Sequence, residues 1–249
     1  MNINLNYLSS YAVPFLRKSV FPSLTAQQKK ILVIATLAIG FFGACCVMRC
    51  CFKRLKDENG VLNGKGKRTH RDGSIREGEF KDDKLNGQGK IFTDNGHIWE
   101  GVFKENRLNG QGIVYFSDGT KAEGEFKDNK LNGNGKIIMD NGSLWEGDFK
   151  ENRLNGRGKI TSLDGTLWEG DFKENELNGQ GKVIFQNGTI IEGEFKESKL
   201  NGQGKVTVEG IIAEGEYRDD RLYGHGKITY SDGKIEKGLF EYDVLIQPI

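Results

Sequence analysis

Apolar and polar positions alternate along most of the chain, and the alternation restarts about every 23 residues. Trp99, Gly101 and Phe103 occupy every second position of one stretch, with mainly charged residues between them. This period of two predicts a β-strand with one buried face. After a predicted loop at residues 105–110, a second alternating stretch places Val114 on an apolar face. Each unit is therefore predicted to contain two strands.

A turn dipeptide closes each of these units. Asn-Gly and Asp-Gly supply the positive φ angles that tight hairpin turns require. Each unit is thus predicted to be a β-hairpin, and consecutive hairpins are predicted to continue one antiparallel sheet. The dipeptides are Asp72-Gly73, Asn95-Gly96, Asp118-Gly119, Asn141-Gly142, Asp164-Gly165, Asn187-Gly188, Glu209-Gly210 and Asp232-Gly233.

Three other landmarks return with the same spacing: an aromatic residue, a Glu-Gly pair before it and an L-N-G-x-G string after it. Together with the turns they account for 32 of the 35 glycines. A fixed period of this length is typical of a repeat array, so function must be sought on a repeated surface. The aromatic positions are Phe80, Phe103, Phe126, Phe149, Phe172, Phe195, Tyr217 and Phe240, spaced by 23 residues except for one interval of 22.

The face that carries the phenylalanines is the first candidate for binding. Trp occurs only at the first inner position of a unit, and other units hold Arg, Ala, Ile or Glu there. Large aromatics that folding does not require in every unit are expected to dominate a protein interface. Packing against the phenylalanines is the competing explanation. The predicted groove residues are Trp99, Phe103, Phe126, Trp145, Phe149, Trp168 and Phe172.

The opposite face carries a lysine column, with one lysine from almost every second strand. It suggests an alternative function in binding anionic lipid. A solvated face neutralised by its own glutamates is the favoured interpretation, because opposite charges on adjacent strands stabilise each other. Ile113 interrupts the column. The alternative lipid residues are Lys90, Lys136, Lys159, Lys182 and Lys205.

Charge differs between the beginning of the chain and the repeats. Residues 1–59 hold eight Lys/Arg against two acidic residues, a net of +6, and residues 60–249 hold 28 against 33, a net of −5. A mildly acidic array is a poor nucleic-acid binder, because that affinity depends on clustered cations. No nucleic acid is therefore expected as a partner.

Residues 31–48 form an uncharged stretch of eighteen residues between Lys30 and Arg49. As a helix it would rise about 27 Å, close to the ~30 Å hydrocarbon core, which predicts a single transmembrane helix. The alternatives are a buried soluble helix and a cleaved export signal, because Phe42-Gly43-Ala44-Cys45 loosely resembles a bacterial lipoprotein cleavage box. Lys and Arg are more numerous after the stretch than before it, which favours a cytoplasmic array. Two interpretations apply to Cys45, Cys46, Cys50 and Cys51: acylation, and the favoured one, packing as small polarizable residues near the helix end.

No catalytic signature is found, and no enzyme activity is expected. The N-G-Q-G-K strings lack the spacing and the Ser/Thr of a phosphate-binding loop. His70, His97 and His225 are dispersed and lack metal-ligand spacing. No cofactor or metal is therefore expected.

The repeated unit resembles the MORN (membrane occupation and recognition nexus) repeat. Trp145 to Lys150, Leu154 to Gly158 and Asp164-Gly165 carry its pattern almost unbroken, with Phe where the family often has Trp. The resemblance implies an all-β array, an elongated, curved single antiparallel sheet that serves as a scaffold. A protein partner is expected in an aromatic groove, and the oligomeric state is left open, a homodimer included. The predicted organisation is a short segment (1–30), a membrane helix (31–48), a basic linker (49–60), seven full units with terminal halves (61–240) and a tail (241–249).

Overall fold

The computed structural model describes residues 60–249, which form an all-β structure without a helix. Seventeen strands belong to one antiparallel sheet, as the alternation predicts. The strands group into two compact units, residues 60–131 and 132–249. In the described part of the chain, no helix has the length and apolar character needed to cross a membrane. The predicted membrane helix at 31–48 lies outside the described residues.

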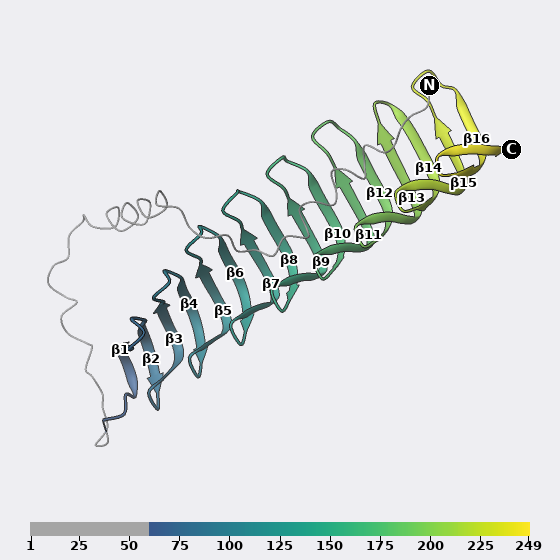
Figure 1. Ribbon diagram of the computed structural model, residues 1–249. Helices are drawn as coiled ribbons and strands as arrows, with labels where there is room; N and C mark the ends of the chain where they lie inside the picture. The colour runs from purple at the N-terminus through teal and green to yellow at the C-terminus, as the bar shows by residue number, and fades with distance from the viewer. Residues whose placement is uncertain (1–59) are drawn as a thin grey trace. The chain divides into compact units, whose positions relative to one another are not determined.

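In the first unit, each strand pairs with the next one in the chain, so the strands form successive hairpins (Figure 1). The strands are β1 (Gly64–Thr69), β2 (Ile75–Lys81), β3 (Lys84–Phe92), β4 (Ile98–Lys104), β5 (Arg107–Tyr115) and β6 (Lys121–Lys127).

The second unit repeats this plan, with β7 lying across the boundary between the units. Neighbouring strands again pair antiparallel from β7 to β17. These strands are β7 (Lys130–Ile138), β8 (Leu144–Lys150), β9 (Arg153–Thr161), β10 (Leu167–Lys173), β11 (Glu176–Ile184), β12 (Ile190–Lys196), β13 (Lys199–Val208), β14 (Ile211–Arg218), β15 (Arg221–Thr229), β16 (Ile235–Glu241) and β17 (Val244–Pro248).

The predicted loop at residues 105–110 is wrong in extent. Only Glu105 and Asn106 form the turn between β4 and β5, with φ angles of 49° and 67°. Two successive positive φ angles define the type I′ turn, which matches the twist of a hairpin. The L-N-G-x-G string that begins at Leu108 therefore lies inside β5. Its first glycine, Gly110, has a φ of 123° and lies between Leu108 and Gly112, where the register with β4 shifts between Phe103 and Gly101.

A pair of hydrogen bonds joins this turn to the preceding hairpin. The Asn106 side-chain Oδ1 accepts the Leu85 N–H at 2.8 Å, and the Asn106 N–H donates to the Leu85 carbonyl at 2.9 Å. We call this contact the leucine clip. It satisfies both backbone groups of a leucine that is fully buried. The same pair of bonds joins Leu62 to Asp83, Leu108 to Asn129, Leu154 to Asn175, Leu177 to Ser198, Leu200 to Asp220 and Leu222 to Asp243.

The predicted Asn-Gly and Asp-Gly turns lie at the other end of each hairpin. In the loop between β11 and β12, Asn187 Oδ1 accepts the Thr189 N–H at 3.0 Å, and Gly188 has a φ of 82°. Only the glycine of the pair needs the positive φ, as in a three-residue hairpin loop that ends in a bulge. Glu209-Gly210 instead forms a two-residue turn with both φ angles positive. That shorter loop accounts for the single 22-residue interval.

A row of glycines crosses each unit in direct register, with one glycine from every strand except β17, where Pro248 lies opposite Gly238. In the second unit Gly147 lies opposite both Gly135 and Gly158. A Cβ on Gly147 would overlap the Arg157 carbonyl oxygen and lie 2.6 Å from the Gly158 Cα. Glycine is therefore required where two strand backbones approach this closely.

Candidate binding surfaces

The predicted groove phenylalanines lie in the core. Phe103, Phe126, Phe149 and Phe172 are between 1 and 5% exposed. Each pairs with a buried leucine across its hairpin where the register is described, as Phe149 does with Leu154. Burying a Phe side chain is worth about 1.5–3 kcal/mol, so these residues supply cohesion within each hairpin. Little of their surface is available for a partner.

The tryptophans of the second unit are more accessible. Trp145 on β8 and Trp168 on β10 are only partly buried, and Ile160 of β9 lies between them in register. Ile160 itself is buried, and so is Val183 on the far side of Trp168. We call residues Ile137, Trp145, Ile160, Trp168 and Val183 the tryptophan row. It forms a continuous apolar line across five adjacent strands.

Trp99 occupies the corresponding place in the first unit, opposite Ile91 on β3 and Val114 on β5. It is partly buried like the other two tryptophans. The row does not need Trp for its register, because Ile191 and Ala213 occupy the same position on β12 and β14. The structure therefore places two of the three tryptophans together and leaves Trp99 in the other unit.

The lysine column forms ion pairs with glutamates that face it across the strands. Lys90 lies 3.0 Å from Glu100, Lys136 3.0 Å from Glu146, Lys182 2.7 Å from Glu192 and Lys205 3.0 Å from Glu214. Lys159 lies in register between Glu146 and Glu169. Such exposed pairs each contribute about 0–1 kcal/mol. Their main effect is to balance the charge of this outer face.

The outer face also carries an apolar row that the sequence analysis did not single out. On β3, β4 and β5 it consists of Phe92, Ile98 and Tyr115, which lie in register. Tyr115 is 40% exposed, and Lys121 Nζ lies 5.8 Å from its ring. The alternation along each strand could have revealed this row, because Phe92, Ile98 and Tyr115 occupy the alternate positions that point to the charged face.

The histidines occupy separate local environments. His97 Nδ1 accepts the Ser117 N–H at 3.0 Å, and the His97 ring meets Phe116 edge-on at 5.4 Å. His225 is exposed on β15. Among residues 60–249, no group of three His, Cys, Asp or Glu side chains is arranged to hold a metal ion.

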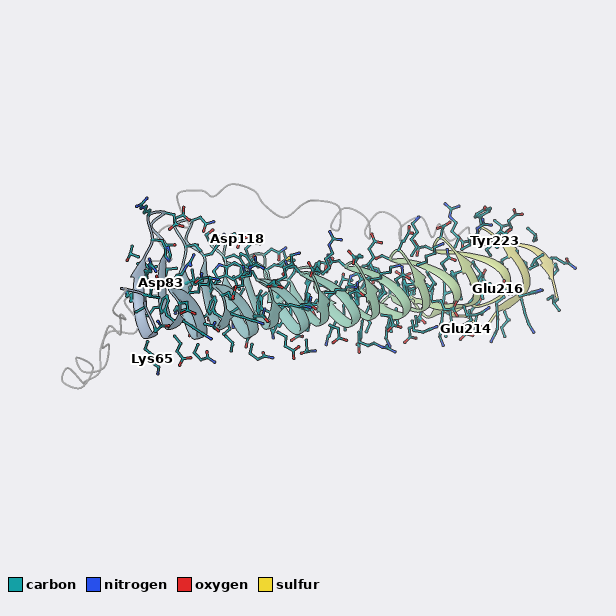
Figure 2. All side chains as sticks on the ribbon, turned by 90° about the horizontal axis from the view of Figure 1, so that it is seen from below. Lys65, Asp83, Asp118, Glu214, Glu216 and Tyr223 are labelled. Carbon is teal, nitrogen blue, oxygen red and sulfur yellow. The ribbon has the colours of Figure 1, made fainter. Side chains whose placement is uncertain are left out.

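A shallow cavity of about 680 Å³ lies at β12 to β15 and is mainly polar. Glu216 and Tyr223 belong to its lining and are labelled near the last strands in Figure 2. The Arg218 guanidinium lies 5.4 Å from the Tyr223 ring, and Lys199 pairs with Asp219 at 3.6 Å. Its lining carries both positively and negatively charged side chains, so its charge favours neither an anionic nor a cationic ligand.

These features define a single-layer β-repeat protein. Glycines allow its strands to approach closely, and leucine clips join one hairpin to the next. A comparison with protein families matches the MORN repeat at residues 58–75, 77–97, 99–121, 123–144, 145–167, 168–190, 192–207 and 214–235. The chain belongs to the MORN repeat family.

Two solved structures give weaker likenesses. The TCP10 domain of Danio rerio CPAP in complex with a STIL peptide is 16% identical over 71% of this chain and 84% of that chain, with a TM-score of 0.40. The Drosophila melanogaster SAS-4 TCP domain, in complex with a proline-rich motif of Ana2, is 14% identical over 71% and 90%, with a TM-score of 0.32. No curated protein matches the chain by sequence.

Proposed function

We propose that this protein is a non-catalytic scaffold that binds a protein partner through the tryptophan row. The carrying observation is the contrast between two aromatic positions of the same strands. Phe149 and Phe172 are buried, whereas Trp145 and Trp168 keep accessible surface on one line. Accessible tryptophans beside a packed apolar line are the residues expected to dominate an interface.

The proposal places the scaffold at a membrane. Its support is the uncharged stretch 31–48, which has the length of a short transmembrane helix. The Lys and Arg residues that follow the stretch favour a cytoplasmic array. An elongated, curved arrangement of the repeats would present the tryptophan row along a groove.

A protein partner is favoured over anionic lipid as the ligand of the array. The lysine column is paired with glutamates, and the second unit holds 15 basic against 21 acidic residues, a net of −6. A net negative unit is repelled by an anionic surface. Lipid tethering through the lysine column is therefore the less favoured function.

Affinity purification of the full-length protein from cells tests the proposal. The test variant combines Trp145→Ala with Trp168→Ala, and the control combines Leu144→Ala with Leu167→Ala on the outer face of the same strands. Partners retained by the wild type and the control should be lost from the tryptophan variant. Equal recovery with all three proteins would rule out the tryptophan row as the site. Flotation with anionic vesicles would then test the lysine column.

A further inference from the structure

The inner row begins with two arginines that face each other directly. Arg68 on β1 is the register partner of Arg76 on β2. The next strands of the same unit hold Ile91 and Trp99 in this row. Like charges opposite each other on adjacent strands destabilise a sheet. The pair is therefore destabilising unless a negatively charged group neutralises it.

The described residues neutralise this pair only in part. Arg68 donates to Asp83 at 2.6 Å, a carboxylate that also accepts the Leu62 N–H. The Asp72 carboxylate is engaged by the Ser74 N–H at 2.8 Å. Buried atoms Nε of Arg76 and Nε2 of His70 have no hydrogen-bond partner among residues 60–249. A buried polar atom without a partner destabilises the fold, so a ligand that forms hydrogen bonds with both atoms would stabilise it.

The surface beside His70 is hollowed and carries the positive charges of Arg68 and Arg71. A depression of about 560 Å³ is lined by Arg68, Thr69, His70, Arg71 and Asp72. The pKa of His70 is lowered by burial and by the positive charges of Arg76 and Arg68, with Asp72 opposing them. The positive charges of Arg68 and Arg76 thus both act on the His70 ring.

We propose that the first hairpin binds an oxyanion, a phosphate or a carboxylate group, between Arg68 and Arg76 and beside His70. A guanidinium offers a planar pair of donors that matches both kinds of group. The oxyanion would offset the repulsion between the two arginines and provide an acceptor for the Arg76 Nε–H. This site is separate from the tryptophan row and does not depend on the proposed scaffold function.

Thermal unfolding of the full-length protein in a nonionic detergent tests this site. Sodium chloride, sodium acetate and inorganic phosphate are compared at equal ionic strength. Bound oxyanion should raise Tm by about 3–6 °C at ten times its Kd, and Tm should go on rising with the logarithm of the oxyanion concentration. A larger response to phosphate identifies a phosphate site, and a larger response to acetate identifies a carboxylate site.

Two variants make the outcome specific. Arg76→Ile matches the apolar residues of the same row, so it should raise Tm in chloride and abolish the response to oxyanions. The control Arg107→Ile lies in the same unit in an exposed ion pair with Asp128, and it should keep the response. A response that survives in Arg76→Ile, or a wild-type Tm that oxyanions raise no more than chloride does, overturns the proposal. In the latter case the arginines serve only to discourage strand pairing at β1.

Discussion

Asn106 holds Leu85 by two hydrogen bonds across 21 residues of sequence, one from its side chain and one from its backbone. Leu85 lies on β3 and Asn106 lies in the turn that follows β4, so the contact ties one hairpin to the next. Asn and Asp suit this position because they tolerate a positive φ and carry a short acceptor. The leucine clip therefore links turn geometry to the stacking of repeats.

Removing the clip should destabilise the first unit. Asn106→Gly keeps the positive φ and removes only the acceptor, so it should cost about 1–3 kcal/mol for the buried Leu85 N–H. Asn106→Ala should cost more, because Ala is also strained at this φ. Urea unfolding measures both. A glycine variant as stable as the wild type would show that the side-chain bond contributes nothing.

The partly buried clip residue Asp220 should make stability depend on pH. Burial raises its pKa above the ordinary 3.8, against the Leu200 N–H and Lys199, which favour the ionised form. A raised folded-state pKa adds stability below the unfolded pKa, and this stability is lost as pH rises through the folded pKa. Asp220→Asn gives this clip the same acceptor residue type as the clip at Asn106. The variant should therefore be more stable than the wild type at pH 7.

The advantage of Asp220→Asn should shrink as pH falls through the raised folded-state pKa of Asp220 toward 3.8, because the folded wild-type carboxyl becomes protonated over that range. Urea midpoints at pH 7 and pH 3.5 measure the change. Asp219→Asn, at the exposed neighbouring position, is the control and should change stability by less than about 0.5 kcal/mol at either pH. An advantage that is equal at both pH values would contradict the burial explanation.

The face assignment predicts unequal effects for two adjacent residues on β8. Phe149→Ala should cost about 3–5 kcal/mol, because it empties a buried site in the core. Lys150→Ala, on the exposed face, should cost less than about 0.5 kcal/mol. Urea melts that shift equally for both variants would show that the faces are assigned wrongly.

Glycines of the same repeat should differ in their tolerance of a side chain. Gly147→Ala should be severely destabilising, on the order of 4 kcal/mol, because its Cβ would overlap the facing strand. Gly142→Ala lies in the turn with nothing within 4 Å, so only its positive φ of 87° opposes the change, at about 1–2 kcal/mol. Thermal melts should separate the two, and a mild Gly147→Ala would contradict the close approach of the strands.

The proposed anchor predicts that the full-length protein stays in the membrane fraction after alkaline carbonate extraction. Ile34→Arg combined with Leu37→Arg should release it, because each buried charge opposes insertion by about 2.5–3.5 kcal/mol. Carbonate release of the wild type would exclude a spanning helix. A shortened, acylated product made by signal peptidase II would instead indicate the lipoprotein alternative.

The sequence located the repeats and the two faces of each strand, because side chains on a strand alternate with a period of two. That rule places Phe149 inside and Lys150 outside without any knowledge of the neighbouring strands. Sequence also identified the tryptophan positions, whose importance for binding stays a prediction.

Tertiary structure decided which asparagine forms the turn and which residues face each other. Asn106 and Asn109 both carry a local turn signal, but only Asn106 can reach Leu85 on the preceding hairpin. The Arg68–Arg76 pair and the glycine row likewise depend on strand register. These contacts depend on how each strand lies against the next one. Alternation within one strand fixes a side chain's face, but not the partner opposite it.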